Sequence, residues 1–189
     1  MPPGVKTFPW TASPSRCAAP SPSSATPPHE GGPLYRFPFV SNTQAGVAAV
    51  ALGIAAHAVE AYAALGRTAD ATAQVHYGQA TARLDLARAG WWEVTRAAWE
   101  RVVAGEALDH ASQARVALAC TRATHEAAAA VDLLHAVGGM AAMSDHGDLG
   151  RCWRDVHAAT QHSSVRVANY ASAGAVLLDA AGETETPRA

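Results

Sequence analysis

Apolar residues recur at steps of three and four positions from about residue 41 onward, which is the period of helices that bury one face. In the first predicted helix, Ser41 or Asn42 caps the start, the chain runs to about Leu65, and Gly66 ends it. Its predicted buried face consists of the apolar residues at these steps: Val47, Val50, Ile54, Ala58, Ala61 and Leu65.

A second helix is predicted to start at Asp70 or Thr72 and to reach about Ala104, with Gly105 as its stop. Its apolar stripe follows a heptad spacing, which is typical of long packed helices. The stripe consists of Tyr77, Ala80, Leu84, Ala87, Trp91, Val94, Ala98 and Val102.

A third helix is predicted to start at Asp109 or Ser112 and to end at Gly138-Gly139. Its apolar face consists of Val116, Ala119, Ala123, Ala127, Ala130, Leu134 and Val137. A loop is expected at residues 140–147. Two shorter helices follow, at about 149–160 and 165–181, and Gly182 is expected to close the last one.

These five helices, with no alternating strand pattern, predict an all-α fold: an antiparallel up-down helical bundle. Ten of the eleven prolines lie in residues 1–38, so no proline interrupts a helix in the rest of the bundle. Residues 1–32, rich in Pro, Ser and Thr, are predicted to be a disordered leader. The bundle is then expected at 33–182 and a disordered tail at 183–189.

Composition narrows the function classes. Hydrophobic residues make up 49% of the chain but aromatic residues only 6%, so alanine supplies much of the packing surface. A net charge of -2 with scattered arginines argues against nucleic-acid or membrane partners, and the apolar stretch 45–56 is too short to span a bilayer. Three cysteines without CxxC spacing and no signal-peptide pattern predict a cytoplasmic protein without a disulfide framework.

Few residue patterns point to chemistry on their own. Asp132 and His135 have the spacing of a metal-binding pair on a helix, but the further ligands of a metal centre are missing, so no metal is expected. Trp91, Trp92 and Trp99 are interpreted as core or subunit contacts, with a substrate-pocket wall as the alternative. Another residue, Cys120, is interpreted as a small core residue in the third helix.

Three segments in this order resemble a known family: residues 34–39 (LYRFPF), 131–139 (VDLLHAVGG) and 152–162 (CWRDVHAATQH). Together they resemble the C-terminal domain of acyl-CoA dehydrogenases. The resemblance is greater to the two-component flavin-dependent monooxygenases built on that scaffold, such as the hydroxyphenylacetate hydroxylases and dibenzothiophene monooxygenase. It covers about residues 33–181. A dehydrogenase needs a carboxylate base, and the absence of Glu between Ala127 and Gly182 also favours the monooxygenase branch.

The resemblance implies a reduced flavin, FMN or FAD, that reacts with oxygen and oxygenates a small organic substrate. It implies that His162 lies beside flavin and substrate, to stabilise the oxygenated flavin or to deprotonate the substrate. It also implies cofactor contacts from Gly138 and Gly139, and from Arg154 and Asp155. Its implied partners are further copies of the chain, as a dimer or tetramer, and a separate flavin reductase.

Several alternatives stay open. Residues 1–32 are too few for the helical domain and β-barrel that precede the bundle in such enzymes. The chain is then a fragment, works with a separate polypeptide that carries those domains, or is a non-catalytic oligomerisation bundle; an unrelated helical binding protein is the third hypothesis. For single residues, His162 could be a helix-end histidine, Gly138-Gly139 a helix stop, and Arg154 with Asp155 a surface ion pair. A surface or structural role is expected for His157.

Overall fold

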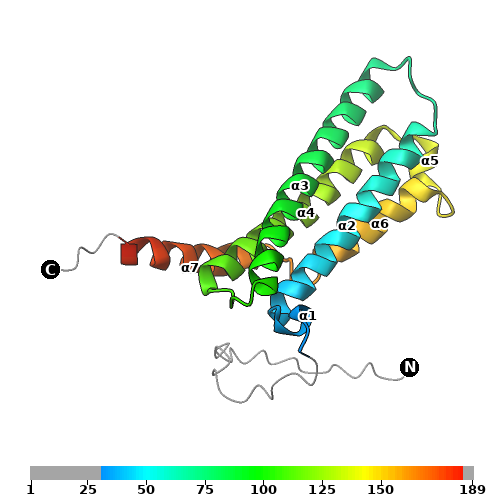
Figure 1. Cartoon of the computed structure of the whole chain (residues 1–189). Helices are drawn as coiled ribbons and strands as arrows, with labels where there is room; N and C mark the ends of the chain where they lie inside the picture. The colour runs from blue at the N-terminus through cyan, green and yellow to red at the C-terminus, as the bar shows by residue number, and fades with distance from the viewer. Residues whose placement is uncertain (1–30, 185–189) are drawn as a thin grey trace, which may run out of the picture.

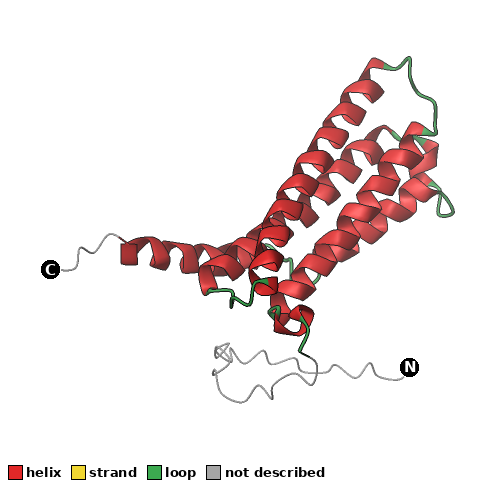
Figure 2. Cartoon of the chain, in the orientation of Figure 1, coloured by secondary structure: helices red, strands yellow, loops and turns green. Residues whose placement is uncertain are grey.

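The structure is a computed structural model that describes residues 31–184, so the predicted leader and tail lie almost entirely outside the described residues. Within this range the chain forms helices joined by turns and short loops (Figures 1 and 2). The helices are α1 (Pro33–Arg36), α2 (Phe39–Ala63), α3 (Ala71–Val103), α4 (His110–Val137), α5 (Met140–Met143), α6 (Asp148–Thr160) and α7 (Ala168–Thr184). The prediction of an all-α bundle is confirmed.

Helix α4 is the centre of the bundle. It contacts α2, α3, α6 and α7, and α6 also packs against α2 (Figure 1). Five of the seven residues of its predicted apolar face are fully or almost fully buried: Val116, Ala123, Ala127, Ala130 and Leu134. Because most of these side chains are alanines, the neighbouring backbones can approach closely, and the core is built from many small contacts.

The stripe predicted for α3 also lies on the packed side of that helix. Ala80, Leu84, Ala98 and Val102 are buried, and the other four positions are partly buried against the same core. Much of the rest of α3 is exposed, including Leu86 at 76%. The helix therefore covers α4 with one narrow face and leaves a broad face open.

Helix α2 differs from its prediction in its start and in its buried face. It begins at Phe39, directly after Pro38, so Ser41 is not the cap but a buried residue of the first turn. Val50 is 60% exposed. The buried residues are Ser41, Gln44, Ala48, Ala51, Leu52, Ala55, Ala58 and Tyr62. The mainly small face of α2 packs against α4, and the larger β-branched side chain at 50 stays outside this close contact.

The predicted helix starts at Asp70 and Asp109 are confirmed. The Asp70 carboxylate accepts a hydrogen bond from the backbone N–H of Thr72 at 2.9 Å, and the Asp109 carboxylate accepts one from the N–H of Ser112 at 2.6 Å. These bonds satisfy donors that have no partner inside the helix. At the far end of α3, Gly105 adopts a φ of 91°, a left-handed conformation that glycine adopts without steric cost.

The Asp109 cap makes stability depend on pH in a defined direction. The hydrogen bond from the Ser112 backbone N–H is the main cause that lowers the pKa of Asp109 below its ordinary value of 3.8. A carboxyl whose pKa is lower in the folded chain stabilises the fold above its unfolded pKa, and this contribution is lost as the pH falls through the folded pKa.

Asp109→Asn keeps a capping side chain and removes the charge, so we expect it to lower the Tm at neutral pH. As the pH falls below 3.8 and through the lowered pKa of Asp109 in the folded chain, its Tm should converge on that of the parent chain. Thermal melts across this range check the prediction, with the exposed Asp179→Asn as the control. A Tm difference that is the same at both ends of the range would contradict it.

The C-terminal third departs from prediction at three places. The predicted loop at 140–147 contains the one-turn helix α5, α7 begins at Ala168 rather than near 165, and α7 continues past Gly182 to Thr184. A glycine stops a helix only where the chain turns away, and here the chain remains helical through it. Helix α7 contacts only α4 among the described helices and extends away from the others (Figure 1).

One described helix, α2, is long and apolar enough to cross a membrane by length and composition alone. The expectation that this region is too short for a span is therefore wrong. The same helix packs against α3, α4 and α6, and core helices of water-soluble proteins meet the same criterion. The composition of α2 is thus explained by its place in the bundle.

Candidate functional site

The predicted site residue His162 lies in the segment 161–167, which joins α6 to α7 and is here named the His162 turn. The side chain of His162 is exposed, and its Nδ1 accepts a hydrogen bond from the backbone N–H of Ser164 at 3.2 Å. Val165 of the same turn is completely buried. Its carbonyl oxygen accepts a hydrogen bond from Nε2 of His125, on α4, at 3.1 Å. An exposed imidazole is thus held on a turn that is anchored in the core.

Gly138 closes α4 as predicted and is enclosed by the chain itself. A Cβ atom at this position would lie 2.6 Å from Cδ2 of Leu149 and 2.8 Å from Cβ of Ala142. Because Ala142 has no side-chain freedom, the space around Gly138 admits only glycine without a shift of the backbone. Packing between α4, α5 and α6 therefore explains glycine at 138.

Gly139 is exposed and has a φ of 58°, which favours glycine because a Cβ atom is strained there. Arg67, from the loop between α2 and α3, lies directly beside it. The Arg67 guanidinium donates hydrogen bonds to the carbonyl oxygens of Val137 at 2.8 Å and of Gly138 at 3.3 Å. The end of α4 is therefore covered by a cation, which suits the negative end of a helix dipole.

The other two predicted site residues lie on α6. The Arg154 guanidinium donates to the carbonyl oxygen of Asp145 at 3.2 Å and lies 3.9 Å from its carboxylate. Asp155 is exposed. Arg154 thus forms an exposed ion pair with Asp145, in the loop before α6, and not with its neighbour Asp155.

The structure does not bring all the predicted site residues together. Gly138 faces Leu149 at the start of α6, and His162 follows the end of the same helix. Helix α6 is thirteen residues long, which corresponds to roughly 20 Å along the helix axis. The glycine turn with Arg67 and the His162 turn are therefore two separate features.

The side chains of Asp132 and His135 both contact α6. The Asp132 carboxylate accepts hydrogen bonds from Nε1 of Trp153 and from Nε2 of His157, both at 2.8 Å. The ring of His135 stacks on that of Trp153 at a centroid distance of 5.0 Å. No cluster of three metal-ligating side chains is found among residues 31–184. These four residues fasten α6 to α4, and His157 has the structural role expected of it.

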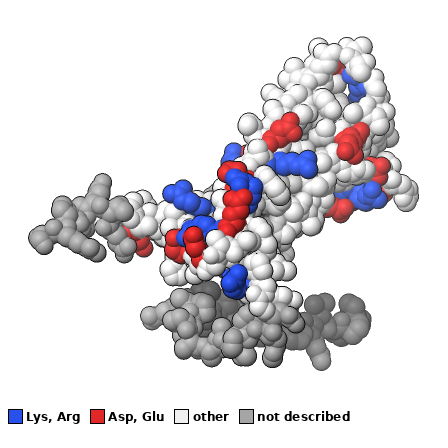
Figure 3. Space-filling view, viewed as in Figure 1, with Lys and Arg blue, Asp and Glu red and all other residues white. Residues whose placement is uncertain are grey.

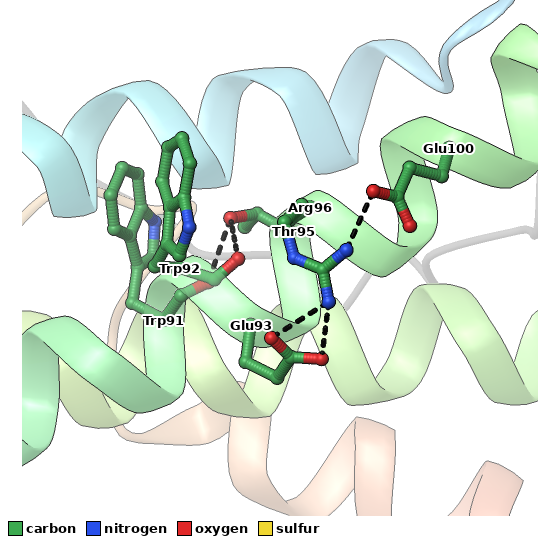
Figure 4. Close-up of polar contacts among 6 residues, drawn as sticks. All are labelled: Trp91, Trp92, Glu93, Thr95, Arg96 and Glu100. Atoms are coloured by element: carbon green, nitrogen blue, oxygen red, sulfur yellow. Dashed lines mark hydrogen bonds and ion pairs between the residues drawn. The ribbon is translucent and has the colours of Figure 1, made fainter.

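The tryptophans of α3 divide into packed and exposed residues. Trp91 is partly buried against the core, whereas Trp92 is 58% exposed and Trp99 38% exposed. In Figure 4 the rings of Trp91 and Trp92 lie side by side, and the Arg96 guanidinium pairs with glutamates one turn before and one turn after it. The core interpretation holds for Trp91. Of these three tryptophans, Trp92 has the largest exposed fraction and is the most available to a partner.

Cys120 is a small core residue, as the sequence predicts. Its side chain is fully buried, and burial raises the pKa of its thiol to about 12. A thiol that stays protonated is a poor nucleophile and a poor metal ligand. Cysteine chemistry at this position is therefore not part of the candidate site.

The structure shows features that the sequence pattern did not indicate. An open cavity of about 310 Å³ lies between the starts of α2 and α4 and the first half of α7. Gln44, only 5% exposed, lines it together with Asn169. The Asn169 side-chain amide donates to the carbonyl of Ser164 at 2.5 Å, so the cavity adjoins the His162 turn. Across the face seen in Figure 3, acidic and basic side chains are interspersed rather than gathered into one patch.

Comparison with known proteins identifies the family of this chain. The sequence profile of the acyl-CoA dehydrogenase C-terminal domain matches residues 45–167. An indole-3-acetate monooxygenase of Pseudomonas putida is 31% identical over 161 residues, which cover 79% of this chain and 41% of that protein. The indole-3-acetate monooxygenase of Acinetobacter baumannii is 24% identical and covers 76% of this chain and 40% of that protein.

Two solved structures share the fold. The 3-HSA hydroxylase from Rhodococcus sp. RHA1 superposes with a TM-score of 0.71 at 25% identity, over 84% of this chain and 41% of that chain. XiaF from Streptomyces sp., solved in complex with FADH2 and glycerol, superposes with a TM-score of 0.73 at 20% identity, over 78% and 41%. This chain spans about two fifths of the length of these relatives. It belongs to the family of acyl-CoA dehydrogenase C-terminal domains.

Proposed function

We propose that this chain supplies the helical part of a flavin-dependent monooxygenase, which uses reduced flavin and oxygen to oxygenate a small organic substrate. The observation that carries the proposal is the exposed His162 imidazole on a turn anchored to the core through Val165. The relatives named as monooxygenases match over most of this chain, and one related structure contains FADH2. The N-terminal and barrel domains come from a separate polypeptide or from a longer form of this chain.

The residues of the His162 turn fit such a cofactor. A flavin ring is flat, largely apolar and edged with hydrogen-bonding atoms, and an exposed imidazole can donate one hydrogen bond to it or to bound oxygen. The flavin, when bound, supplies the activation of oxygen. The chain supplies an oriented imidazole and, through the bundle, a surface from which water is excluded once an N-terminal and a barrel domain cover it.

The second feature, the turn of Gly138 and Gly139, is proposed to bind another part of the cofactor. Gly139 has an exposed backbone, and the Arg67 guanidinium beside it can attract a phosphate. Arg154 and Asp155 are proposed to contribute from α6. Roughly 20 Å separates this turn from His162, so a single flavin that contacts both must be an extended FAD. Alternatively, the glycine turn and the His162 turn contact two different flavins, FMN or FAD, in an oligomer.

The proposed partners follow from the exposed apolar surface. Leu178 of α7 is 76% exposed, Val167 before it 65%, and Trp92 of α3 58%. Exposed apolar side chains of this size can be covered by a partner chain. We propose that the chain forms a dimer or tetramer with further copies, receives reduced flavin from a separate reductase, and acts in the cytoplasm without nucleic-acid or membrane partners.

An anaerobic titration of the purified chain with reduced FAD and reduced FMN tests the proposal. We expect micromolar binding, weakened roughly tenfold in His162→Ala, because one hydrogen bond to a charged or polar ring is lost. His146→Ala, an exposed histidine in the loop before α6, is the matched control and should bind as the parent does. An absence of binding to either flavin would favour the alternative of a non-catalytic oligomerisation bundle, for which the exposed residues of α7 already argue.

A further inference from the structure

Besides the backbone hydrogen bond from the Val165 N–H to the His162 carbonyl at 3.0 Å, three hydrogen bonds that involve side chains hold the His162 turn. The backbone N–H of Ser164 donates to His162, and the carbonyl of Ser164 accepts from the side chain of Asn169, on α7. The next carbonyl, of Val165, accepts from His125, on α4. A turn held by side chains from two helices has a defined conformation, although His162 itself is exposed.

The bond from Ser164 fixes which ring nitrogen of His162 carries the proton. A backbone N–H can only donate, so Nδ1 of His162 must accept with its lone pair. The neutral ring then carries its proton on Nε2. With Nδ1 occupied, the nitrogen left for a ligand is Nε2, and it is a donor.

The chemistry of His162 follows from this tautomer. A neutral histidine with its proton on Nε2 donates a hydrogen bond to an oxygen atom but cannot take a proton at that nitrogen. Abstracting a substrate proton would require the other tautomer, in which an N–H at Nδ1 would face the N–H of Ser164. The turn therefore favours the first of the two roles that resemblance implies for this histidine, stabilisation of an oxygen atom, over the second.

We propose that His125 is a positioning residue for His162: it holds the His162 turn in the conformation that keeps the ring proton on Nε2. His125 is partly buried on α4, forty residues from Val165 along the chain, and it bonds to the carbonyl that follows Ser164. Its Nε2 must itself be protonated, since a carbonyl oxygen only accepts. Only the role of His162 toward a bound ligand rests on the proposed function; the positioning of its turn by His125 does not.

The test is long-range ¹H–¹⁵N NMR of the whole chain labelled in its histidine rings, well above the ordinary histidine pKa of about 6.5. In the parent chain, His162 should show a pyridine-type nitrogen at Nδ1 and a pyrrole-type nitrogen at Nε2. In His125→Ala, the two nitrogens should move toward the mixed values of a free histidine, and the Ser164 amide should exchange roughly tenfold faster, the factor for one lost hydrogen bond.

His125→Gln retains a side-chain donor and should restore both the single tautomer and the slow exchange. His146→Ala should change neither, because it removes an exposed histidine far from the turn in sequence. If His125→Ala does not fold, Asn169→Ala tests the same turn from α7, and it should loosen the Ser164 amide in the same way.

Two results would overturn the proposal: a parent His162 with its proton on Nδ1, or an unchanged tautomer and exchange rate in a folded His125→Ala variant. If that variant does not fold, an unchanged Asn169→Ala has the same consequence. Addition of reduced flavin to the same sample separates this inference from the proposed function. A fixed tautomer that depends on His125, with no response of the His162 ring to reduced FAD or FMN, leaves the positioning intact and removes the flavin role.

Discussion

Gly150→Ala is expected to lower the free energy of unfolding by about 2–3 kcal/mol, the upper part of the usual range for overpacking. A Cβ atom at this buried position of α6 would lie 2.7 Å from the carbonyl oxygen of Ala142 and 2.9 Å from that of Ser144. Both are backbone atoms, so no side-chain rotation relieves the contact. The substitution must separate α5 from α6, and urea unfolding of the variant measures the loss.

Two other helical glycines provide the control. A Cβ atom at Gly53 of α2 or at Gly90 of α3 would meet no atom within 4 Å, so alanine is accommodated there. Alanine in a helix interior stabilises relative to glycine by roughly 0.5–1 kcal/mol, because the unfolded chain has fewer conformations to lose. An equal effect of alanine at 53, 90 and 150 would show that α5 and α6 do not pack as described.

The second large effect concerns the proposed activity. In a chimera, residues 33–184 replace the matching part of the Pseudomonas putida indole-3-acetate monooxygenase, of which the match covers 41%. We expect this chimera to oxygenate indole-3-acetate when supplied with reduced flavin. His162→Ala in the chimera should lower kcat/KM roughly 100-fold or more, the range for loss of one positioned hydrogen-bond donor that stabilises developing charge on an oxygen atom. Product formation and oxygen uptake measure the effect.

His146→Ala in the same chimera is the matched control and should retain the parental kcat/KM. Circular dichroism and the flavin content of each chimera distinguish loss of chemistry from loss of folding. The proposal would not survive a folded, flavin-loaded His162→Ala chimera with full activity. Such a result would indicate that His162 is a helix-end residue without a role in the reaction.

The sequence predicted the long helices well where the signals are local. Asp70 and Asp109 precede their helices by one residue, and their carboxylates accept hydrogen bonds from nearby N–H groups. Such a cap can therefore be predicted from a short stretch of sequence. The buried face of α2 could not be read in this way. Alanine and valine at neighbouring positions are both apolar, and only the closeness of α4 decides that Val50 stays outside. The short α5 carries too few residues to show a period.

The candidate site was likewise predicted only in part. His162, Arg154 and Asp155 were identified because they stand close together in one segment that resembles the family. Arg67 bonds to a carbonyl seventy residues away, and His125 to one forty residues away. Neither forms a motif with its sequence neighbours, so only the packed bundle shows that they hold the glycine turn and the His162 turn.

The most direct test of the flavin proposal is a crystal structure of the chimera prepared with reduced FAD under anaerobic conditions. The account predicts that the flavin ring lies against the His162 turn, with Nε2 of His162 as a hydrogen-bond donor facing the ring or its substrate. A flavin ring bound elsewhere, with the turn of residues 161–167 in open solvent, would contradict it.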